Sequence, residues 1–234
     1  PILGTIIHGT LEELYKPLIG KILIENDIKI CIKNIDDEVL KQFKLVYKEG
    51  EIKKGRNLLA FEVAKRNVSN FLKVEQESIK NGDAIKILAL EETFARQLTH
   101  PNLPFPVLIK GNVDRIEERN GIIRIIDYKT GKVEKASVTL KTWEALTEDI
   151  KTDKIIQVLA YAYMYEQEAK DKPIEAGIIS FKNLKAGFLP FNFKEDKEIY
   201  SIINEEILSN YLEQMVLLLS EILDENVPFE EKLI

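Results

Sequence analysis

An aspartate and a lysine stand at the end of an apolar segment, in the sequence IIRIIDYKTGK at residues 122 to 132. Its run of isoleucines predicts a strand. Side chains two residues apart in a strand lie on one face, so Asp127 and Lys129 point in the same direction. Charged residues at the end of a strand can simply be solvated. An ammonium beside a carboxylate at the end of an apolar strand also suits a reaction on a charged substrate.

A second carboxylate is expected to face the first across a hairpin. An Asn-Gly pair at 120–121 separates two apolar segments, and this is the strongest short signal for a β-hairpin. With both residues in the turn, Arg119 pairs with Ile122, and the same register sets Asp114 opposite Asp127. Opposed side chains have Cβ atoms about 4.5–5.5 Å apart, and like charges there repel each other. The carboxylates share a proton or a cation, unless the protein tolerates the repulsion.

The elements that must position these residues follow from the periodicity of apolar side chains. Helical patterns cover residues 4 to 18, 34 to 80, 152 to 170 and 196 to 223. Strand patterns cover residues 84 to 98, 107 to 118, 122 to 129, 174 to 181 and 187 to 193. This order predicts an α/β or α+β fold, in which helices flank a mixed central sheet. The polar-rich helical block at 34 to 80 has the character of an insertion into that core.

The bulk properties restrict the class of protein. The chain has 234 residues and a net charge of −6, so a stand-alone DNA-binding protein, which is usually basic, is disfavoured. Cys31 is the single cysteine and cannot form an internal disulfide, which fits a reducing, cytoplasmic location. No apolar stretch is long enough for a membrane helix. Because the sequence starts at Pro1 in a helical pattern, we expect a piece of a longer protein.

Four motifs in order along the chain resemble one known family. The segment GNVDRIEERNGIIRIIDYKTGK is similar to the active-site hairpin of the PD-(D/E)XK nuclease superfamily, and most to the nuclease domains of RecB and AddB helicase–nucleases. The stretch GTIIHGTLEELY supplies a histidine, His8, in the place of that family's first motif. Gln157 and Tyr161 match its Gln-x-x-x-Tyr motif on the helix after the catalytic strand.

The resemblance implies a restriction-endonuclease-like core and a role for each matching residue. A metal, Mg²⁺ or Mn²⁺, would be held by His8, Asp114, Asp127 and the backbone carbonyl of Tyr128. Lys129 would position or activate the attacking water. Gln157 and Tyr161 would orient Lys129 or touch the DNA backbone. AddB-type nucleases hold an iron–sulfur cluster through four cysteines, and with Cys31 alone no such cluster is expected here.

The function that the resemblance implies is metal-dependent hydrolysis of DNA. We expect an exonuclease domain that works in a repair or recombination machine with helicase domains or a partner subunit, and with no membrane. One alternative is a catalytically silent nuclease fold that binds DNA or a partner. Another is an acid–base hydrolase that uses the aspartate pair without metal, and this alternative gives His8 and Lys129 no role.

Overall fold

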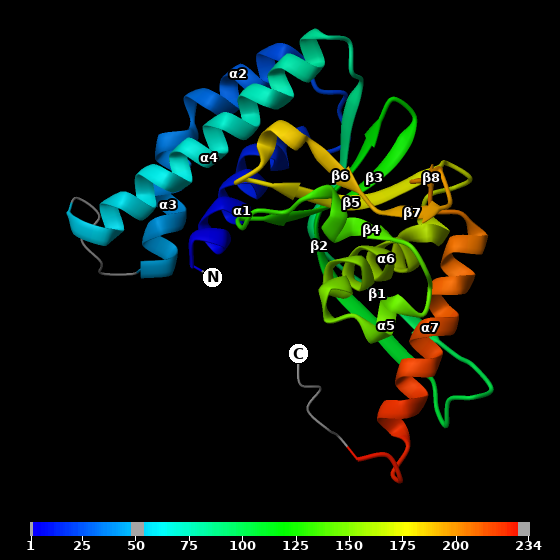
Figure 1. The fold of residues 1–234 in the computed structure, drawn as a ribbon. Helices are drawn as coiled ribbons and strands as arrows, with labels where there is room; N and C mark the ends of the chain where they lie inside the picture. Colours follow the sequence, from blue (N-terminus) through cyan, green and yellow to red (C-terminus); the bar gives the residue numbers. More distant parts are fainter. Residues whose placement is uncertain (1, 48–53, 229–234) are drawn as a thin grey trace.

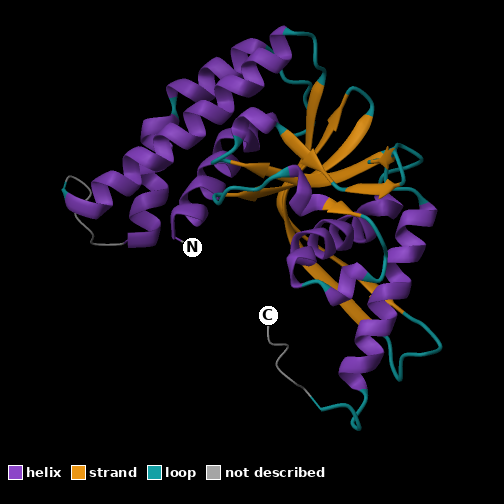
Figure 2. Cartoon of the chain, viewed as in Figure 1, coloured by secondary structure: helices purple, strands orange, loops and turns teal. Residues whose placement is uncertain are grey.

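A five-stranded mixed sheet forms the centre of the protein in the computed structural model, which describes residues 2–47 and 54–228 (Figures 1 and 2). Its strand order is β1-β2-β3-β5-β6. The strands are β1 (Ile85–Leu98), β2 (Val107–Arg119), β3 (Ile122–Lys129), β5 (Ile174–Ser180) and β6 (Phe188–Pro190). The α/β fold with a mixed sheet between helices agrees with the expectation from the sequence.

The β2–β3 hairpin has the register that its turn predicts. Arg119 pairs with Ile122, and the antiparallel ladder continues to Arg115 opposite Ile126. Asn120 and Gly121 both have positive φ, at 52° and 87°, as a two-residue turn between twisted strands requires. The next position in this register holds the two aspartates.

Strand β3 also pairs in parallel with β5, and helix α6 (Asp153–Tyr165) connects them. Parallel neighbours need such a crossover, and its helix packs on one face of the sheet. Thr152 occupies the N-cap position of α6, but its hydroxyl donates to the carbonyls of Leu146 and Asp149 instead of capping the helix. The crossover therefore brings α6 next to the end of β3 that carries Asp127 and Lys129.

Two separate groups of helices cover the two faces of the sheet (Figure 1). On one face, α6 and α7 (Glu205–Leu223) share a core with Ile123, Ile125 and Ile178. On the other, α1 (Ile2–Tyr15) and three further helices share a core with Ile126 and Tyr128. Because consecutive residues of β3 face opposite cores, the strand is apolar almost throughout, as is usual for a strand buried on both faces.

The block at 34 to 80 is helical where the structure describes it. It contains α3 (Ile35–Tyr47) and α4 (Gly55–Lys80), and residues 48 to 53 lie outside the described residues. A helix that the sequence did not predict, α2 (Glu25–Lys33), precedes them. Val39, Phe43 and Phe71 pack against α1 and the sheet, so this block shares the main core. Its status as an insertion stays a prediction.

The last helix begins later than predicted. Residues 198 to 200 form strand β8 (Glu198–Tyr200), and α7 begins at Glu205, where the Asn204 side chain accepts a hydrogen bond from the Ile207 N–H. Strand β8 joins β7 (Asn192–Glu195) and β4 (Thr139–Leu140) in a small second sheet that the sequence did not predict. Of the described helices, none is long and apolar enough to cross a membrane.

Candidate metal centre

His8 of α1 points at two carboxylates of the sheet. Its Nδ1 lies 3.3 Å from Asp114 Oδ1 on β2 and 3.6 Å from Glu91 Oε1 on β1. The neighbouring Ile6, Ile7 and Leu11 are fully buried and hold α1 against the sheet. One ligand atom from each of His8, Glu91 and Asp114 lies within 4.8 Å of the others, a spacing that one metal ion could bridge.

Asp114 is fixed by the backbone of the opposite strand. Its Oδ2 accepts a hydrogen bond of 2.6 Å from the N–H of Tyr128. The β2–β3 ladder ends one residue earlier, at Arg115 and Ile126, so this side chain takes the place of a further backbone bond. The carboxylate is thereby aimed at His8, and one oxygen is left for a ligand.

Glu91 was not predicted from the sequence. The β1–β2 ladder pairs Leu90 with Arg115 and Glu92 with Val113, which sets Glu91 opposite Asp114. Glu91 has a positive φ of 46°, which is uncommon outside glycine, and the register of β1 shifts a few residues earlier, between Ile87 and Ala89. Alternation along β1 gives no signal for this residue, because the register shifts between Ile87 and Ala89, and Ile85 and Ile87 pack in one core while Ala89 packs in the other.

Asp127 lies outside this cluster and contacts Lys129 instead. Lys129 Nζ is 2.7 Å from Asp127 Oδ2, and the carboxylate is almost fully buried, with 5% of the side chain exposed. Burial is the main reason that the pKa of Asp127 rises to about 6, and the negative charge of Asp114 adds to the rise while Lys129 opposes it. Asp127 therefore interacts with Asp114 electrostatically, as the predicted register implies.

Helix α6 supplies a chain of hydrogen bonds to Lys129. Lys129 Nζ donates to Gln157 Oε1 at 2.9 Å, and Gln157 Nε2 donates to the Tyr161 hydroxyl at 2.8 Å. Gln157 and Tyr161 are one helical turn apart, so they share a face of α6. Burial raises the pKa of Tyr161 to about 12, and the charge of Asp127 adds to this rise. The predicted residues Lys129, Gln157 and Tyr161 are thus brought together.

The charge of His8 depends on its two carboxylate neighbours. Burial alone would lower the pKa of His8, but the hydrogen bonds that its ring donates to Asp114 and Glu91, together with the charges of these carboxylates, outweigh burial and raise it to about 10. At neutral pH the metal-free protein therefore carries a protonated His8 between two carboxylates. A metal ligand must be neutral imidazole, so metal binding here releases that proton.

The donor set fits a hard or borderline divalent cation. Two carboxylate oxygens and one imidazole nitrogen suit Mg²⁺ or Mn²⁺, and the hydrogen bond from Tyr128 to Asp114 is the kind of outer contact that orients a ligand. The structure shows the Tyr128 N–H at the site, so the predicted role of its carbonyl as a ligand stays a prediction.

An open cleft of about 690 Å³ gives access to these residues from solvent. Its lining includes His8, Glu91 and Lys129, with Thr130, Lys132 and Lys154 around them. The cleft combines acidic groups near His8 with three lysines. This mixture suits a cation and an anionic substrate at adjacent positions.

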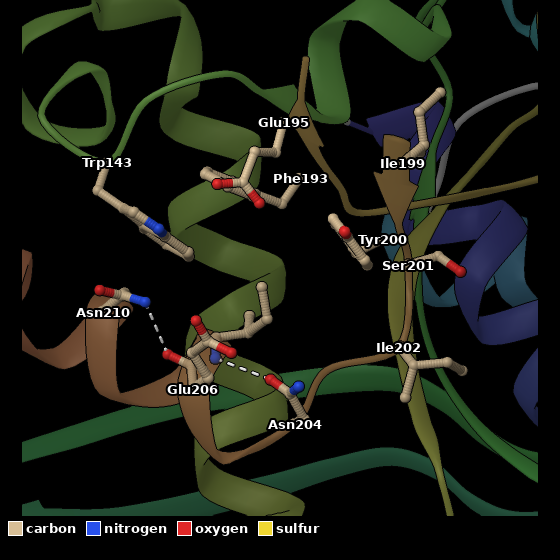
Figure 3. A pocket seen from close by; sticks show the side chains of 11 residues that line it. Trp143, Phe193, Glu195, Ile199, Tyr200, Ser201, Ile202, Asn204, Glu206 and Asn210 are labelled. Atoms are coloured by element: carbon tan, nitrogen blue, oxygen red, sulfur yellow. Dashed lines mark hydrogen bonds between the residues drawn. The ribbon is translucent and has the colours of Figure 1, made fainter. Parts of the chain in front are cut away.

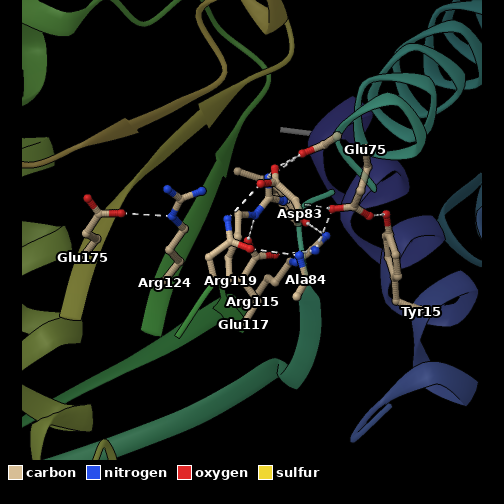
Figure 4. Close-up of polar contacts among 12 residues, drawn as sticks. Tyr15, Glu75, Asp83, Ala84, Arg115, Glu117, Arg119, Arg124 and Glu175 are labelled. Atoms are coloured by element: carbon tan, nitrogen blue, oxygen red, sulfur yellow. Dashed lines mark hydrogen bonds and ion pairs between the residues drawn. The ribbon is translucent and has the colours of Figure 1, made fainter. Parts of the chain in front are cut away.

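A network of buried charges stands behind the site (Figure 4). Arg115 follows Asp114 on β2 and is fully buried, with Nη2 2.7 Å from Glu75 Oε1 of α4 and a close contact to Glu117. Its Nη1 donates to the hydroxyl of Tyr128 at 3.4 Å, and Tyr15 of α1 donates to Glu75. The network thus joins the helices to the two strands that carry the aspartates.

Comparison with known proteins places this arrangement in a family. A search of curated proteins finds no match to the chain. The sequence model of the PD-(D/E)XK nuclease superfamily matches residues 1–232, which is nearly the whole chain. The match includes α1, the β2–β3 hairpin and α6, and thus every residue of the site described above. The chain belongs to the PD-(D/E)XK nuclease superfamily.

Proposed function

We propose that the protein hydrolyses phosphodiester bonds of DNA with the help of Mg²⁺ or Mn²⁺. Membership of the nuclease superfamily supports a metal-dependent nuclease. The observation that carries the proposal is the convergence of His8, Glu91 and Asp114 beside the Asp127–Lys129 pair. A cation site directly next to a lysine is what attack on an anionic phosphodiester requires.

His8, Glu91 and Asp114 would hold the metal in this proposal. Asp127 would become a fourth ligand once Lys129, which contacts it, turns toward the substrate. The bound cation supplies a Lewis acid and a water of lowered pKa. Asp114 keeps its orientation through the Tyr128 N–H. Asp127, whose raised pKa reflects an unfavourable buried charge, gains stabilisation from a cation.

Lys129 positions the attacking water and offsets the negative charge that develops on the phosphate. Gln157 accepts one of its hydrogen bonds and so restricts where the ammonium points. Tyr161 receives a hydrogen bond from Gln157 and fixes that amide in turn. The predicted catalytic set Asp114, Asp127, Lys129, Gln157 and Tyr161 therefore acts as one unit.

Finer features of the function are also proposed. We propose an exonuclease of the RecB/AddB type that acts in the cytoplasm with helicase domains or a partner subunit, as one nuclease domain of a longer protein, with residues 34 to 80 inserted. The motif resemblance of His8, Asp114, Lys129 and Gln157 supports it. A catalytically silent module is the second candidate, and the acidic net charge of −6 favours it.

The decisive experiment measures cleavage of linear and circular DNA by the wild type and by Lys129→Ala and Asp114→Asn. We expect Mg²⁺- or Mn²⁺-dependent cleavage that EDTA abolishes and that both variants lose by at least a hundredfold. Release of nucleotides from linear DNA, with circular DNA left intact, indicates an exonuclease. Lys44→Ala, an exposed lysine of α3, is the control and retains full activity.

Three results would change the assignment. Cleavage that survives EDTA indicates the metal-free aspartate pair. No cleavage together with no binding of Mn²⁺ indicates the silent module. Wild-type cleavage by Lys129→Ala contradicts the role of this lysine.

A further inference from the structure

A second cleft lies away from the metal centre. It has a volume of about 680 Å³ and is lined by β7, β8, the start of α7 and the loop before the short helix α5 (Ala145–Glu148). Its walls include Trp143, Phe193, Glu195, Tyr200, Glu206 and Asn210 (Figure 3). No residue of the metal centre lines it, so it is a separate feature of the surface.

Apolar side chains form much of this second cleft and remain open to solvent. The rings of Trp143 and Phe193 stack at 5.0 Å between centroids and 14° between planes. Ile199, Tyr200 and Ile202 keep 49%, 42% and 39% of their surface exposed. Apolar groups gathered around one concave surface, rather than scattered singly, are typical of a surface that binds another molecule.

The two charged residues that line the second cleft, Glu195 and Glu206, are both acidic, and Glu198 lies just outside the lining in the adjoining turn region, which also holds Lys197. Glu195 pairs directly with Glu198 across β7 and β8, two positions along from the pair formed by Phe193 and Tyr200. Like charges opposed on a sheet are destabilising. Among the residues that the structure describes, no lysine or arginine forms an ion pair with Glu195, Glu198 or Glu206, and the described lining contains no cation. The repulsion between Glu195 and Glu198 is thus not offset by an ion pair within the described part of the chain.

We propose that the second cleft binds an extended segment of a partner protein that carries lysine or arginine next to apolar residues. The basic side chains pair with Glu195 and Glu206 in the cleft and with Glu198 beside it, and an apolar side chain packs on the Trp143–Phe193 stack. Strand β8 is the edge of its sheet, which suits a neighbour in extended form. A nucleic acid is disfavoured because its phosphates would meet these carboxylates. The inference does not depend on the nuclease activity.

The test uses Trp143, the single tryptophan of the chain, as the reporter. The whole chain is titrated with a capped peptide of alternating lysine and valine while the tryptophan emission is recorded. We expect a saturable change in emission. The same peptide with glutamate in place of lysine produces none. Glu195→Gln combined with Glu198→Gln weakens binding of the lysine peptide at least tenfold.

A matched variant controls for net charge. Glu213→Gln combined with Glu221→Gln removes two exposed carboxylates further along α7 and should leave the affinity within twofold of wild type. Equal weakening by the two double variants would show that overall charge, not the second cleft, attracts the peptide.

Absence of any emission change with the lysine peptide also overturns the proposal. So does tighter binding of a thymidine oligonucleotide at Trp143, which would make this a nucleic-acid surface. Nuclease activity of Glu195→Gln with Glu198→Gln stays at the wild-type level.

Discussion

The carboxylate of Asp114 accepts a hydrogen bond of 2.6 Å from the backbone N–H of Tyr128, directly after Asp127 on the opposite strand. This bond lies where the β2–β3 ladder stops, and it orients the carboxylate of Asp114 at the end of the hairpin. Each aspartate is followed by a residue of the buried network, Arg115 after Asp114 and Tyr128 after Asp127. Alternation along the two strands therefore puts the reactive groups on one face and their support on the other.

Glu91→Gln tests the ligand that the sequence did not reveal. The amide keeps the size of the side chain but removes a charge that faces His8 and Asp114. We expect Mn²⁺ affinity, measured by calorimetric titration, to fall at least tenfold. Glu92→Gln alters the adjacent exposed residue of β1 and serves as the control. Unchanged affinity in Glu91→Gln would remove this residue from the metal centre.

The pKa of His8 predicts how the stability of the metal-free protein depends on pH. Its folded value of about 10 exceeds the unfolded value of 6.5, so the folded state binds more protons between these limits. The contribution of His8 is therefore fully present below pH 6.5 and is lost as pH rises toward 10, at up to about 1.4 kcal/mol per pH unit. Melting temperatures in EDTA should fall over this window more steeply for wild type than for His8→Asn. Melting temperatures that fall with pH at the same rate in wild type and His8→Asn would contradict the prediction.

Asp127→Asn should stabilise the metal-free protein while it abolishes cleavage. The folded pKa of Asp127, about 6, lies above the unfolded value of 3.8, so its contribution to stability is lost as pH rises through this range. Above pH 6 the buried charge opposes folding by on the order of 3 kcal/mol, because the folded and unfolded pKa values of Asp127 differ by about 2. Thermal unfolding in EDTA at pH 8 measures the gain in stability of Asp127→Asn over wild type. At pH 4 this difference in stability should nearly vanish. A less stable variant at pH 8 would show that the ion pair with Lys129 outweighs burial.

The sequence predicts the hairpin well because its register is a local property. An Asn-Gly turn fixes the pairing of Arg119 with Ile122, and all later pairs follow without knowledge of the rest of the fold. His8 and Gln157 lie far from the hairpin in sequence. Their proximity to it could be inferred only from the resemblance to a family, since no periodicity brings α1 and α6 to β3.

The features that the sequence did not predict depend on irregular or very short elements. The register shift between Ile87 and Ala89 and the positive φ of Glu91 interrupt the regular course of β1, and strand alternation does not anticipate such breaks. Strands β4 and β8 have two and three residues, too few to show a period, and the single strand predicted at 187 to 193 is divided into β6 and β7, which belong to different sheets. The start of the last helix was placed too early because the charged segment at 196 to 204 fits a helical pattern as well as a hairpin.

Gln157→Leu tests whether the helix positions Lys129. Without the amide, the ammonium loses its partner at 2.9 Å and is left with Asp127, which pulls it away from the substrate. We expect kcat for DNA cleavage to fall about 10- to 100-fold while Mn²⁺ affinity stays within twofold of wild type. Tyr161→Phe removes the hydroxyl one step further away and should have a smaller effect in the same direction. Loss of metal affinity in Gln157→Leu would instead indicate a structural role.

Arg115→Met tests the buried network. The substitution leaves Glu75 and Glu117 buried without their main counter-charge, and breaking such a pair typically destabilises a protein by about 3–5 kcal/mol. Burial already raises the pKa of Glu75, so this carboxyl takes up a proton readily once Arg115 is gone. The variant should therefore be far less stable at pH 8 than at pH 5, by chemical denaturation.

Adding Glu75→Gln to Arg115→Met should recover part of the loss at pH 8, because one uncompensated charge is removed. If the double variant is no more stable than Arg115→Met at either pH, packing of the arginine on Tyr15, rather than its charge, supports the two strands.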